Sequence, residues 1–283
     1  VLQPAGQAGH ERAMLGIGRG LGRKEFDGLR LERGESRRRF TEYAEAILTA
    51  LETGELEYDG DLLQQPRVEI RPTPFATYRG RTFASAVSPA SMTIMAELGV
   101  GLMVIAQKPW DTTQAELAEY RETFRAINGY EAPKPILSMF VAAHENAEEA
   151  QRIHEVHLRR SMASITDHYG FADTSFALVE GYEYYAKLAA NIAKHGVDAF
   201  NAFLAGLQVT GTPDQVTEQL LDYARRIDAG AVLATLSYGD MNAEQAGQHV
   251  DLFAREVLPH LRARDAGGDV GVRYGAGLTA TAG

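Results

Sequence analysis

The chain has 283 residues, 45% of them hydrophobic, which is enough to bury the core of one large α/β domain or of two small ones. Its net charge of -10 argues against binding along a nucleic acid backbone, where neutralised phosphates dominate the affinity. The absence of cysteine excludes disulfides, thiolate metal sites and a cysteine nucleophile. No apolar run reaches the roughly 18 to 20 residues of a membrane span and no signal-peptide pattern is seen, so we expect a cytoplasmic protein without membrane contact.

Basic residues are concentrated in the first part of the chain. Residues 1–40 hold nine Lys and Arg against five Asp and Glu, a local charge of +4 that leaves -14 for the rest. Any anion that this protein binds is therefore expected near the amino-terminal part.

Short runs of apolar and β-branched residues alternate with longer stretches of helical period, the pattern of successive βα units. Strands are predicted at residues 13–18, 82–87, 101–106, 135–143 and 231–238. One apolar helical face follows the first strand, formed by Phe40, Tyr43, Ala44, Ile47, Leu48 and Leu51. Further helices are predicted at residues 88–98, 113–128, 147–164, 182–195, 213–228 and 243–261.

Three segments fall outside this alternation. Residues 54–74 are polar and contain a turn signal at residues 58–60, which predicts a small hairpin or loop. Residues 165–209 carry helical patterns without an evident strand, so we interpret them as an insertion before the last unit that shapes the substrate pocket. Residues 266–283 are mostly Gly, Ala and Thr and are expected to form a flexible tail, which leaves residues 1–265 as a single domain.

Five parallel units fit two architectures, an open doubly wound sheet or part of a (β/α)₈ barrel. A full barrel has eight units in about 250 residues or more, so three units would be missing from this chain. The pattern alone leaves both architectures open.

The first candidate site is the glycine-rich run at residues 16–26, which follows the first predicted strand. Its glycines let backbone N–H groups approach an anion, and Arg19, Arg23 and Lys24 supply countercharge. No Gly-x-Gly-x-x-Gly frame fits the run, so it is not a dinucleotide-binding fingerprint. The alternative is a plain glycine-rich turn with solvated arginines.

The second candidate is the start of the next helix, where Arg37 is followed by two further arginines. Cations at a helix amino terminus oppose the helix dipole, so their placement indicates an anion or a carboxylate nearby. The alternative is that Ser36 caps this helix while the arginines pair with Glu32 and Glu35.

The third candidate is the junction between the second predicted strand and its helix. Ser88 is placed as the cap and Pro89 as the first helical residue. The free N–H groups at this helix start, together with the hydroxyls of Ser88 and Ser91, would form a phosphate-binding site. Capping alone also explains this pattern.

Two further groups of residues carry weaker signals. His154 and His157 lie three apart on a helix, but the zinc-protease spacing is four and no third ligand is evident, so no metal is expected. Six aromatic residues gather in the insertion, and half of them are expected to line an apolar pocket: Tyr169, Phe171, Phe176, Tyr182, Tyr184 and Tyr185.

In order and spacing, these motifs resemble the bacterial luciferase-like flavin monooxygenases. That family has a strand ending in Gly-Ile-(Cys/Gly)-Arg-Gly, then an acidic residue before Phe, then a Ser-Arg pair that opens the next helix. Here these motifs are residues 16–20, Glu25-Phe26 and Ser36-Arg37. The resemblance continues to about residue 262 through residues 58–60, 70–72, 88–91, 209–216 and 253–260.

The resemblance implies an α/β fold of the (β/α)₈ TIM-barrel type, of which about the last five units are present, with a helical insertion before the last strand. It also implies an FMN site at the carboxyl ends of the strands. Phosphate would be held by four residues, Arg19, Arg37, Ser88 and Ser91. The backbone of Gly18, Val87 and Ser88 would lie beside the flavin ring, and Gly20 would also contact the cofactor.

The chain departs from the family pattern in two places. The first three units, which carry a catalytic histidine in the family, have no counterpart here, so no catalytic residue is assigned. Gly18 stands where some relatives have cysteine, which removes a reactive side chain and widens the space beside the flavin.

The implied function is a monooxygenase that uses FMN, reduced by NAD(P)H directly or through a partner reductase, and dioxygen on a small hydrophobic organic substrate. We expect a homodimer that binds neither nucleic acid nor membrane. Two alternatives stay open: a deazaflavin-dependent dehydrogenase on the same fold, and a non-catalytic flavin-binding paralogue.

Overall fold

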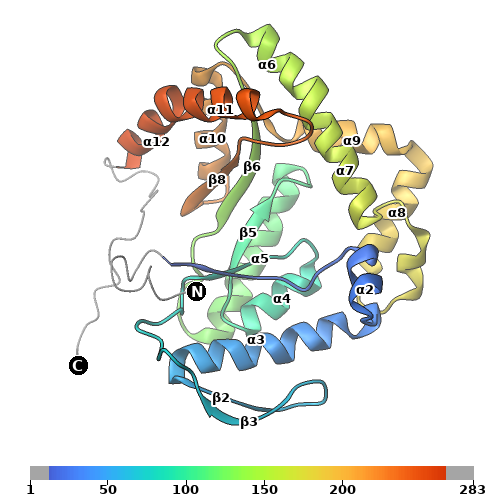
Figure 1. Ribbon diagram of the computed structural model, residues 1–283, viewed down its shortest axis with the longest axis vertical. Helices are drawn as coiled ribbons and strands as arrows, with labels where there is room; N and C mark the ends of the chain where they lie inside the picture. Colours follow the sequence, from blue (N-terminus) through green and yellow to red (C-terminus); the bar gives the residue numbers. More distant parts are fainter. Residues whose placement is uncertain (1–12, 266–283) are drawn as a thin grey trace.

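A parallel β-sheet forms the centre of the protein (Figure 1). The computed structural model describes residues 13–265, so the tail expected at residues 266–283 lies outside the described residues. The sheet contains β1 (Leu15–Ile17), β4 (Thr82–Ser85), β5 (Gly101–Ile105), β6 (Ile136–Ala143), β7 (Val209–Gly211) and β8 (Ala231–Thr235).

From β1 to β6, neighbouring strands of the sheet follow the order of the chain. β1 pairs with β4, β4 with β5 and β5 with β6, always in parallel. The first part of β6 pairs with β8 and its end pairs with the short β7. The five predicted strands are confirmed, and β7 is an addition that the sequence pattern did not predict. Because every pairing is parallel, the carboxyl ends of the strands meet at one edge of the sheet.

Helices connect the strands and cover the sheet. They are α2 (Arg23–Leu29), α3 (Ser36–Thr53), α4 (Pro89–Glu97), α5 (Trp110–Asn128), α6 (Ala147–Ile153), α7 (Arg159–Tyr169), α8 (Glu183–His195), α9 (Val197–Gly206), α10 (Pro213–Arg226), α11 (Ala243–Leu252) and α12 (Leu258–Asp265). Short 3₁₀-helices occur at η1 (Arg33–Glu35) and η3 (Thr174–Leu178), and π-helical turns at η2 (His154–Leu158) and η4 (Phe253–Val257). Within the described part of the chain, no helix is long and apolar enough to cross a membrane.

One hydrophobic core joins the sheet to α4, α5 and α10. Leu102 on β5 and Leu137 on β6 are fully buried, as expected for parallel strands that are covered by helices. Phe124 of α5 and Leu220 of α10 are fully buried in the same core. This core fixes the strand ends at which the candidate site lies.

The polar segment after α3 is a hairpin, as predicted. β2 (Glu55–Asp59) and β3 (Gln64–Glu69) pair in antiparallel and lie beneath α3 in Figure 1. Glu42 on α3 ties the hairpin to the helix, since its Oε2 accepts the backbone N–H groups of Leu62 and Leu63 at 2.8 and 2.9 Å.

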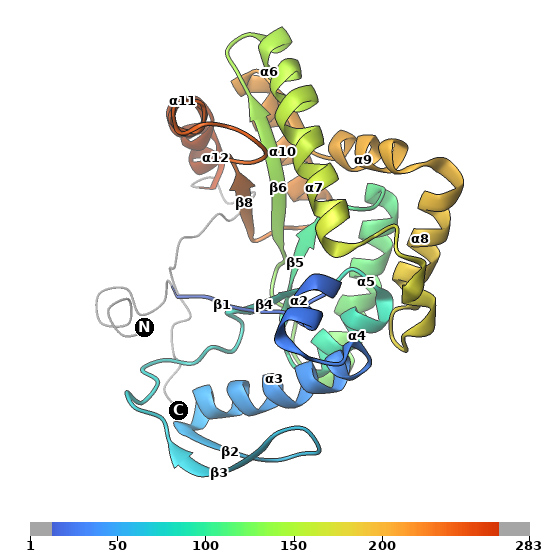
Figure 2. The same ribbon diagram turned by 45° about the vertical axis from the view of Figure 1, so that its right-hand side comes forward.

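The predicted insertion is also confirmed as mainly helical. The segment from α7 to α9 separates β6 from the short β7 and lies beside α2 (Figures 1 and 2). Its two helical patterns are α8 and α9, as predicted, and it differs from the prediction in ending in the strand β7. From the end of the glycine-rich run onward, residues 23–29 form α2, a helix that was not predicted.

Candidate functional site

The carboxyl ends of β1, β4 and β5 surround a cavity of about 220 Å³, here called the glycine-loop cavity. The loop after β1 contributes Gly18, Arg19 and Gly20, and α3 contributes Arg37. The opposite side is formed by Val87 and other residues that follow β4 and β5. A second hollow of about 290 Å³, against the apolar face of α3, shares Gly18 and Arg19 with it.

Six of the seven residues expected to bind the cofactor line this one cavity. They are Gly18, Arg19, Gly20, Arg37, Val87 and Ser91. The exception is Ser88, whose Oγ accepts the backbone N–H of Ser91 at 3.2 Å and lies 2.8 Å from the Ser91 Oγ. Ser88 is therefore the cap of α4 and does not line the cavity, as the alternative interpretation held.

Arg19 and Arg37 reach the cavity from two elements and converge on one carbonyl of the insertion. Nη1 of Arg19 and Nη2 of Arg37 donate to the Gly181 carbonyl at 3.5 and 3.2 Å. The Arg19 guanidinium also lies 4.6 Å from the centre of the Tyr182 ring, in a cation–π contact. The Arg37 Nε is buried and has no hydrogen-bond partner in the described part of the chain. The pair thus retains donor capacity for an anion.

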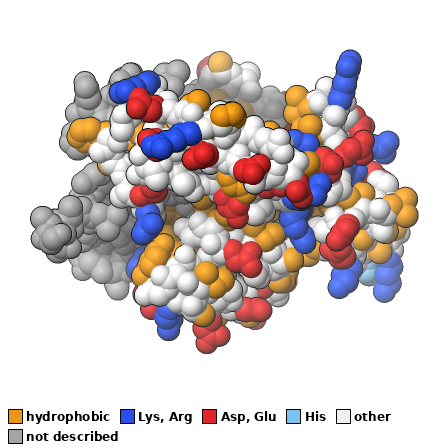
Figure 3. Space-filling view, turned by 90° about the horizontal axis from the view of Figure 1, so that it is seen from below, with side chains coloured by type: hydrophobic (Ala, Val, Ile, Leu, Met, Phe, Trp, Pro, Cys, Tyr) orange, Lys and Arg blue, Asp and Glu red, His pale blue; other side chains and the backbone are white. Residues whose placement is uncertain are grey.

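The other basic residues of the glycine-rich run do not supply countercharge to the cavity, contrary to expectation. Arg23 forms an ion pair with Asp173 at 3.6 Å and Lys24 one with Asp167 at 3.2 Å, which join α2 to the insertion. The remaining arginines of α3 follow the alternative interpretation. Arg39 pairs with Glu35 at 3.0 Å. Basic and acidic side chains are likewise interspersed on the face seen in Figure 3.

Ser36 was considered as the cap of α3, and this interpretation is wrong. The helix follows directly on η1, and the side chain of Ser36 is buried and does not cap it. Its Oγ lies 2.9 Å from the hydroxyl of Tyr182 in the insertion. The start of α3 is therefore held against the insertion, which fixes the position of Arg37.

Aromatic side chains of the insertion form one side of the cavity. Tyr169, Phe171 and Tyr185 line it, half of the aromatic cluster, as expected. The rings of Phe171 and Tyr185 are stacked with centroids 6.1 Å apart. Burial raises the pKa of the Tyr185 hydroxyl to about 12, so this hydroxyl is uncharged at neutral pH. This wall is suited to an apolar molecule.

A lysine that the sequence analysis did not single out secures this region. The ammonium of Lys108 donates to the Val87 carbonyl at 2.6 Å and to both carboxylate oxygens of Glu116 at 2.6 and 2.7 Å. It also lies 4.8 Å from the centre of the Tyr184 ring. Only 12% of the Lys108 side chain is exposed. It therefore ties the end of β4 to α5 and to Tyr184 of α8.

The two histidines weighed as metal ligands have other partners. His154 Nε2 lies 3.1 Å from the Ala205 carbonyl, and His157 Nδ1 lies 2.6 Å from an Asp240 carboxylate oxygen. Among the described residues, no group of three or more His, Cys, Asp or Glu side chains is arranged to hold a metal ion.

Comparison with known proteins identifies the family. The family model described as luciferase-like monooxygenase matches residues 6–229. The chain belongs to this family, and the resemblance inferred from its motifs is confirmed.

Individual relatives are distant. The alkanal monooxygenase alpha chain of Photobacterium leiognathi is 25% identical over 261 residues, which cover 89% of this chain and 71% of the relative. The oxygenating constituent of 3,6-diketocamphane monooxygenase from Pseudomonas putida, solved in complex with FMN, has a TM-score of 0.59 at 15% identity, with 87% of this chain and 70% of that one covered. An F420-dependent secondary alcohol dehydrogenase has a TM-score of 0.63 at 12% identity, with coverage of 91% and 72%. These two structures share the α/β fold of this protein.

Proposed function

We propose that this protein is an FMN-dependent monooxygenase that oxidises a small hydrophobic organic molecule. One observation carries the proposal. Gly18, Arg19, Arg37 and Val87, which come from three separate segments, line a single cavity at the carboxyl ends of neighbouring parallel strands. Ligands of parallel α/β folds bind at this end of the strands.

The residues of the cavity fit a flavin phosphate. A buried guanidinium nitrogen without a hydrogen-bond partner in the described part of the chain, such as Arg37 Nε, lowers the free energy of unfolding unless a ligand accepts its N–H. A guanidinium also matches the geometry of a phosphate group. At Gly18, a side chain would meet no atom within 4 Å, so there is open space beside the loop.

Each part of the site would then have its own task. Arg19 and Arg37 would bind the phosphate, with the Ser91 hydroxyl close by, while Gly18 and Val87 would contact the ring. The aromatic wall of the insertion would exclude water and admit an apolar substrate. When bound and reduced, the flavin supplies the electrons for the reaction with dioxygen.

An aliphatic aldehyde is the first substrate class to test. The support comes from the apolar wall of the cavity and from the curated relative, which is named as an alkanal monooxygenase.

The second candidate is a deazaflavin-dependent dehydrogenase, which transfers a hydride without oxygen. The observation in its favour is the fold shared with the F420-dependent alcohol dehydrogenase. A non-catalytic flavin-binding paralogue is the third candidate, because no catalytic acid or base is assigned.

We further infer that the parallel strands represent five units of a (β/α)₈ barrel. The five are β1, β4, β5, β6 and β8, which are neighbours in chain order as barrel strands are, and the matched relatives extend beyond the covered 70 to 72% of their own length. A homodimer, a supply of reduced FMN from NAD(P)H or a partner reductase, and a cytoplasmic location belong to the same proposal. Light scattering on the purified chain tests the dimer.

Turnover under air tests the proposed reaction. Purified protein is given reduced FMN or reduced deazaflavin, with and without a set of aliphatic aldehydes. The proposal predicts aldehyde oxidation and oxygen consumption coupled to it with reduced FMN only. Hydride transfer with deazaflavin alone supports the second candidate, and flavin binding without substrate-dependent oxygen consumption supports the third.

A further inference from the structure

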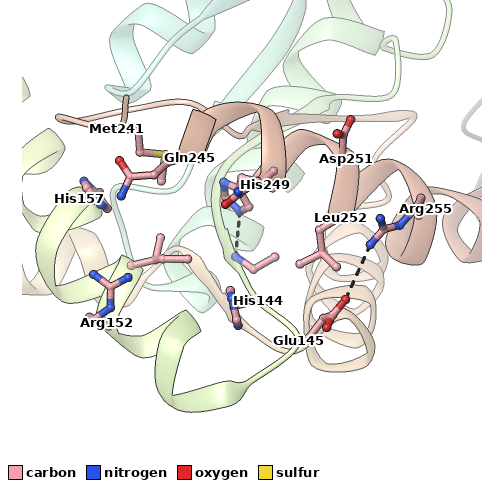
Figure 4. A pocket seen from close by; sticks show the side chains of 13 residues that line it. His144, Glu145, Arg152, His157, Met241, Gln245, His249, Asp251, Leu252 and Arg255 are labelled. Atoms are coloured by element: carbon pink, nitrogen blue, oxygen red, sulfur yellow. Dashed lines mark hydrogen bonds and ion pairs between the residues drawn. The ribbon is translucent and has the colours of Figure 1, made fainter. Parts of the chain in front are cut away.

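Away from the glycine-loop cavity, another cavity of about 360 Å³ lies between α6 and α11, at the carboxyl end of β6 (Figure 4). We call it the α6–α11 cavity. No described residue lines both this cavity and the glycine-loop cavity, so the two are separate. The side chains used below are those of His144, Arg152, His157, Gln245, His249 and Arg255.

Backbone groups occupy the acceptor atoms of two polar side chains that line this cavity. The Nδ1 of His144 accepts the backbone N–H of Asn146 at 3.0 Å, so the neutral ring carries its proton on Nε2. The Oε1 of Gln245 accepts the backbone N–H of Asn242 at 3.0 Å, and its NH₂ group forms no hydrogen bond with any residue of the range 13–265. Both side chains therefore retain an N–H donor, and Gln245 Oε1 also keeps a second lone pair that can accept a hydrogen bond.

Two guanidinium groups add further donors from opposite ends of the cavity (Figure 4). Arg152 uses its Nε to donate to Glu149 at 2.7 Å, and within residues 13–265 its terminal nitrogens form no hydrogen bond. Arg255 approaches Glu145 and Glu256 only to 3.7 Å, which is longer than a hydrogen bond. Both cations thus retain N–H groups for a ligand.

Buried histidines hold the walls in place. His157 is 5% exposed, and its Nδ1 is held 2.6 Å from the Asp240 carboxylate. His249 is 4% exposed; its Nδ1 donates to the Leu236 carbonyl at 2.7 Å and its Nε2 accepts the Ala143 N–H at 2.9 Å. Fixed walls reduce the loss of freedom when a ligand binds.

Both walls also contain a π-helical turn. His157 belongs to η2 and Arg255 to η4. Such turns are rare and occur frequently at functional sites. Two carboxylates, those of Glu145 and Asp251, also line the cavity, and Glu145 lies 3.7 Å from Arg255.

We propose that the α6–α11 cavity binds the oxyanion group of a small molecule, a carboxylate or a phosphate, through Arg152, His144 and Gln245. A guanidinium fork flanked by neutral N–H donors is the arrangement that recognises such groups. This site is independent of the proposed flavin chemistry, since it shares no residue with that cavity.

Calorimetric titration of the full chain tests the proposal, with inorganic phosphate in one arm and acetate in the other, at constant ionic strength. Arg152→Met removes the cation. Gln245→Glu replaces the free NH₂ by an oxygen but keeps the acceptor that caps α11, so the fold is retained. Arg159→Met is the control, because Arg159 is an exposed residue of the adjoining helix that pairs with Glu155 and does not line the cavity.

We expect at least one of the two anions to bind, and the arm with the tighter binding identifies the group. Affinity should fall about tenfold or more in Arg152→Met and Gln245→Glu, as for the loss of a hydrogen bond to a charged group. It should stay within about twofold of wild type in Arg159→Met and in Arg37→Met, which alters only the glycine-loop cavity. Three results would overturn the proposal: neither anion binds, only Arg37→Met abolishes binding, or both cavity variants bind with wild-type affinity.

Discussion

The two cavities hold their arginines in different ways. In the glycine-loop cavity, Arg19 and Arg37 both donate to one backbone carbonyl of the insertion, and the buried Arg37 Nε has no hydrogen-bond partner among the residues that the structure describes. In the α6–α11 cavity, Arg152 and Arg255 are half exposed beside carboxylates. A ligand phosphate is therefore expected to contribute more binding free energy in the first cavity, where solvent screens the charges less.

The largest loss of stability is expected on substitution of Lys108, which holds Val87 in the lining of the glycine-loop cavity and has no contact with the α6–α11 cavity among the described residues. Lys108→Met leaves the Glu116 carboxylate, 16% exposed, without its cation and the Val87 carbonyl without its donor. We expect the free energy of unfolding to fall by about 2 to 4 kcal/mol, measured by urea denaturation. Lys134→Met is the control, because its pair with Asp228 is exposed and contributes less than about 1 kcal/mol. Equal losses in both variants would contradict this assignment.

Gly18 tests whether the first cavity admits a flavin ring. A side chain at Gly18 meets no neighbouring atom, and its φ lies outside the left-handed region, so Gly18→Leu should fold normally. The leucine would occupy the space assigned to the ring, and FMN affinity should fall about 100-fold or more, an energy of roughly 3 kcal/mol. Fluorescence titration measures it. Gly34→Leu, at an equally open position outside the cavity, should bind FMN like the wild type; if Gly18→Leu does so too, the ring lies elsewhere.

The buried ring of His249, which lines the α6–α11 cavity, is expected to make the free energy of unfolding depend on pH. Burial lowers the pKa of His249 below its ordinary value of 6.5, so the unfolded chain takes up a proton that the folded ring resists. Above pH 6.5 this residue does not reduce the free energy of unfolding. As the pH falls from 6.5 toward the lowered pKa of the folded state, the free energy of unfolding decreases by at most about 1.4 kcal/mol per pH unit. Denaturation curves from pH 7 to 5 should show a shallower decline in His249→Gln than in the wild type. Equal slopes would argue against this burial effect.

Tyr182→Phe is expected to give the smallest loss of stability. It distinguishes the contribution of the Tyr182 hydroxyl from that of its ring. The ring beneath Arg19 is kept, while the buried Ser36 hydroxyl loses its partner. The expected loss is about 1 kcal/mol of unfolding free energy, measured by chemical denaturation. Tyr43→Phe, at a half-exposed position, is the control and should lose less. A loss no greater than that of the control would mean that the Ser36–Tyr182 contact contributes little.

Local signals in the sequence predicted most of the fold. The five strands, the hairpin and the cap at Ser88-Pro89 each depend on residues close together in the chain, and all are confirmed. The helix α2 was not predicted, because glycines and charges around Gly22 favour a turn in isolation. It is joined to the insertion by the ion pairs of Arg23 and Lys24, which no local pattern reveals.

The site was predicted only in part for the same reason. Glycines at a strand end mark the loop at Gly18, but the carbonyl of Gly181, which engages both arginines, is more than 140 residues away. Lys108 has no motif of its own, and its role follows from where α5 places Glu116. The α6–α11 cavity likewise depends on hydrogen bonds that determine which atom of His144 or Gln245 remains free.

The central claim is that Arg19 and Arg37 form the phosphate end of an FMN site. Equilibrium titration of FMN into the wild type and into an Arg19→Met/Arg37→Met double variant tests it most directly, with flavin fluorescence as the readout. We predict that the wild type binds one FMN per chain and that the double variant, still folded, binds about 100-fold more weakly or worse, because two hydrogen bonds to a charged phosphate are lost. No FMN binding by the wild type, or equal affinity in the double variant, would contradict the claim.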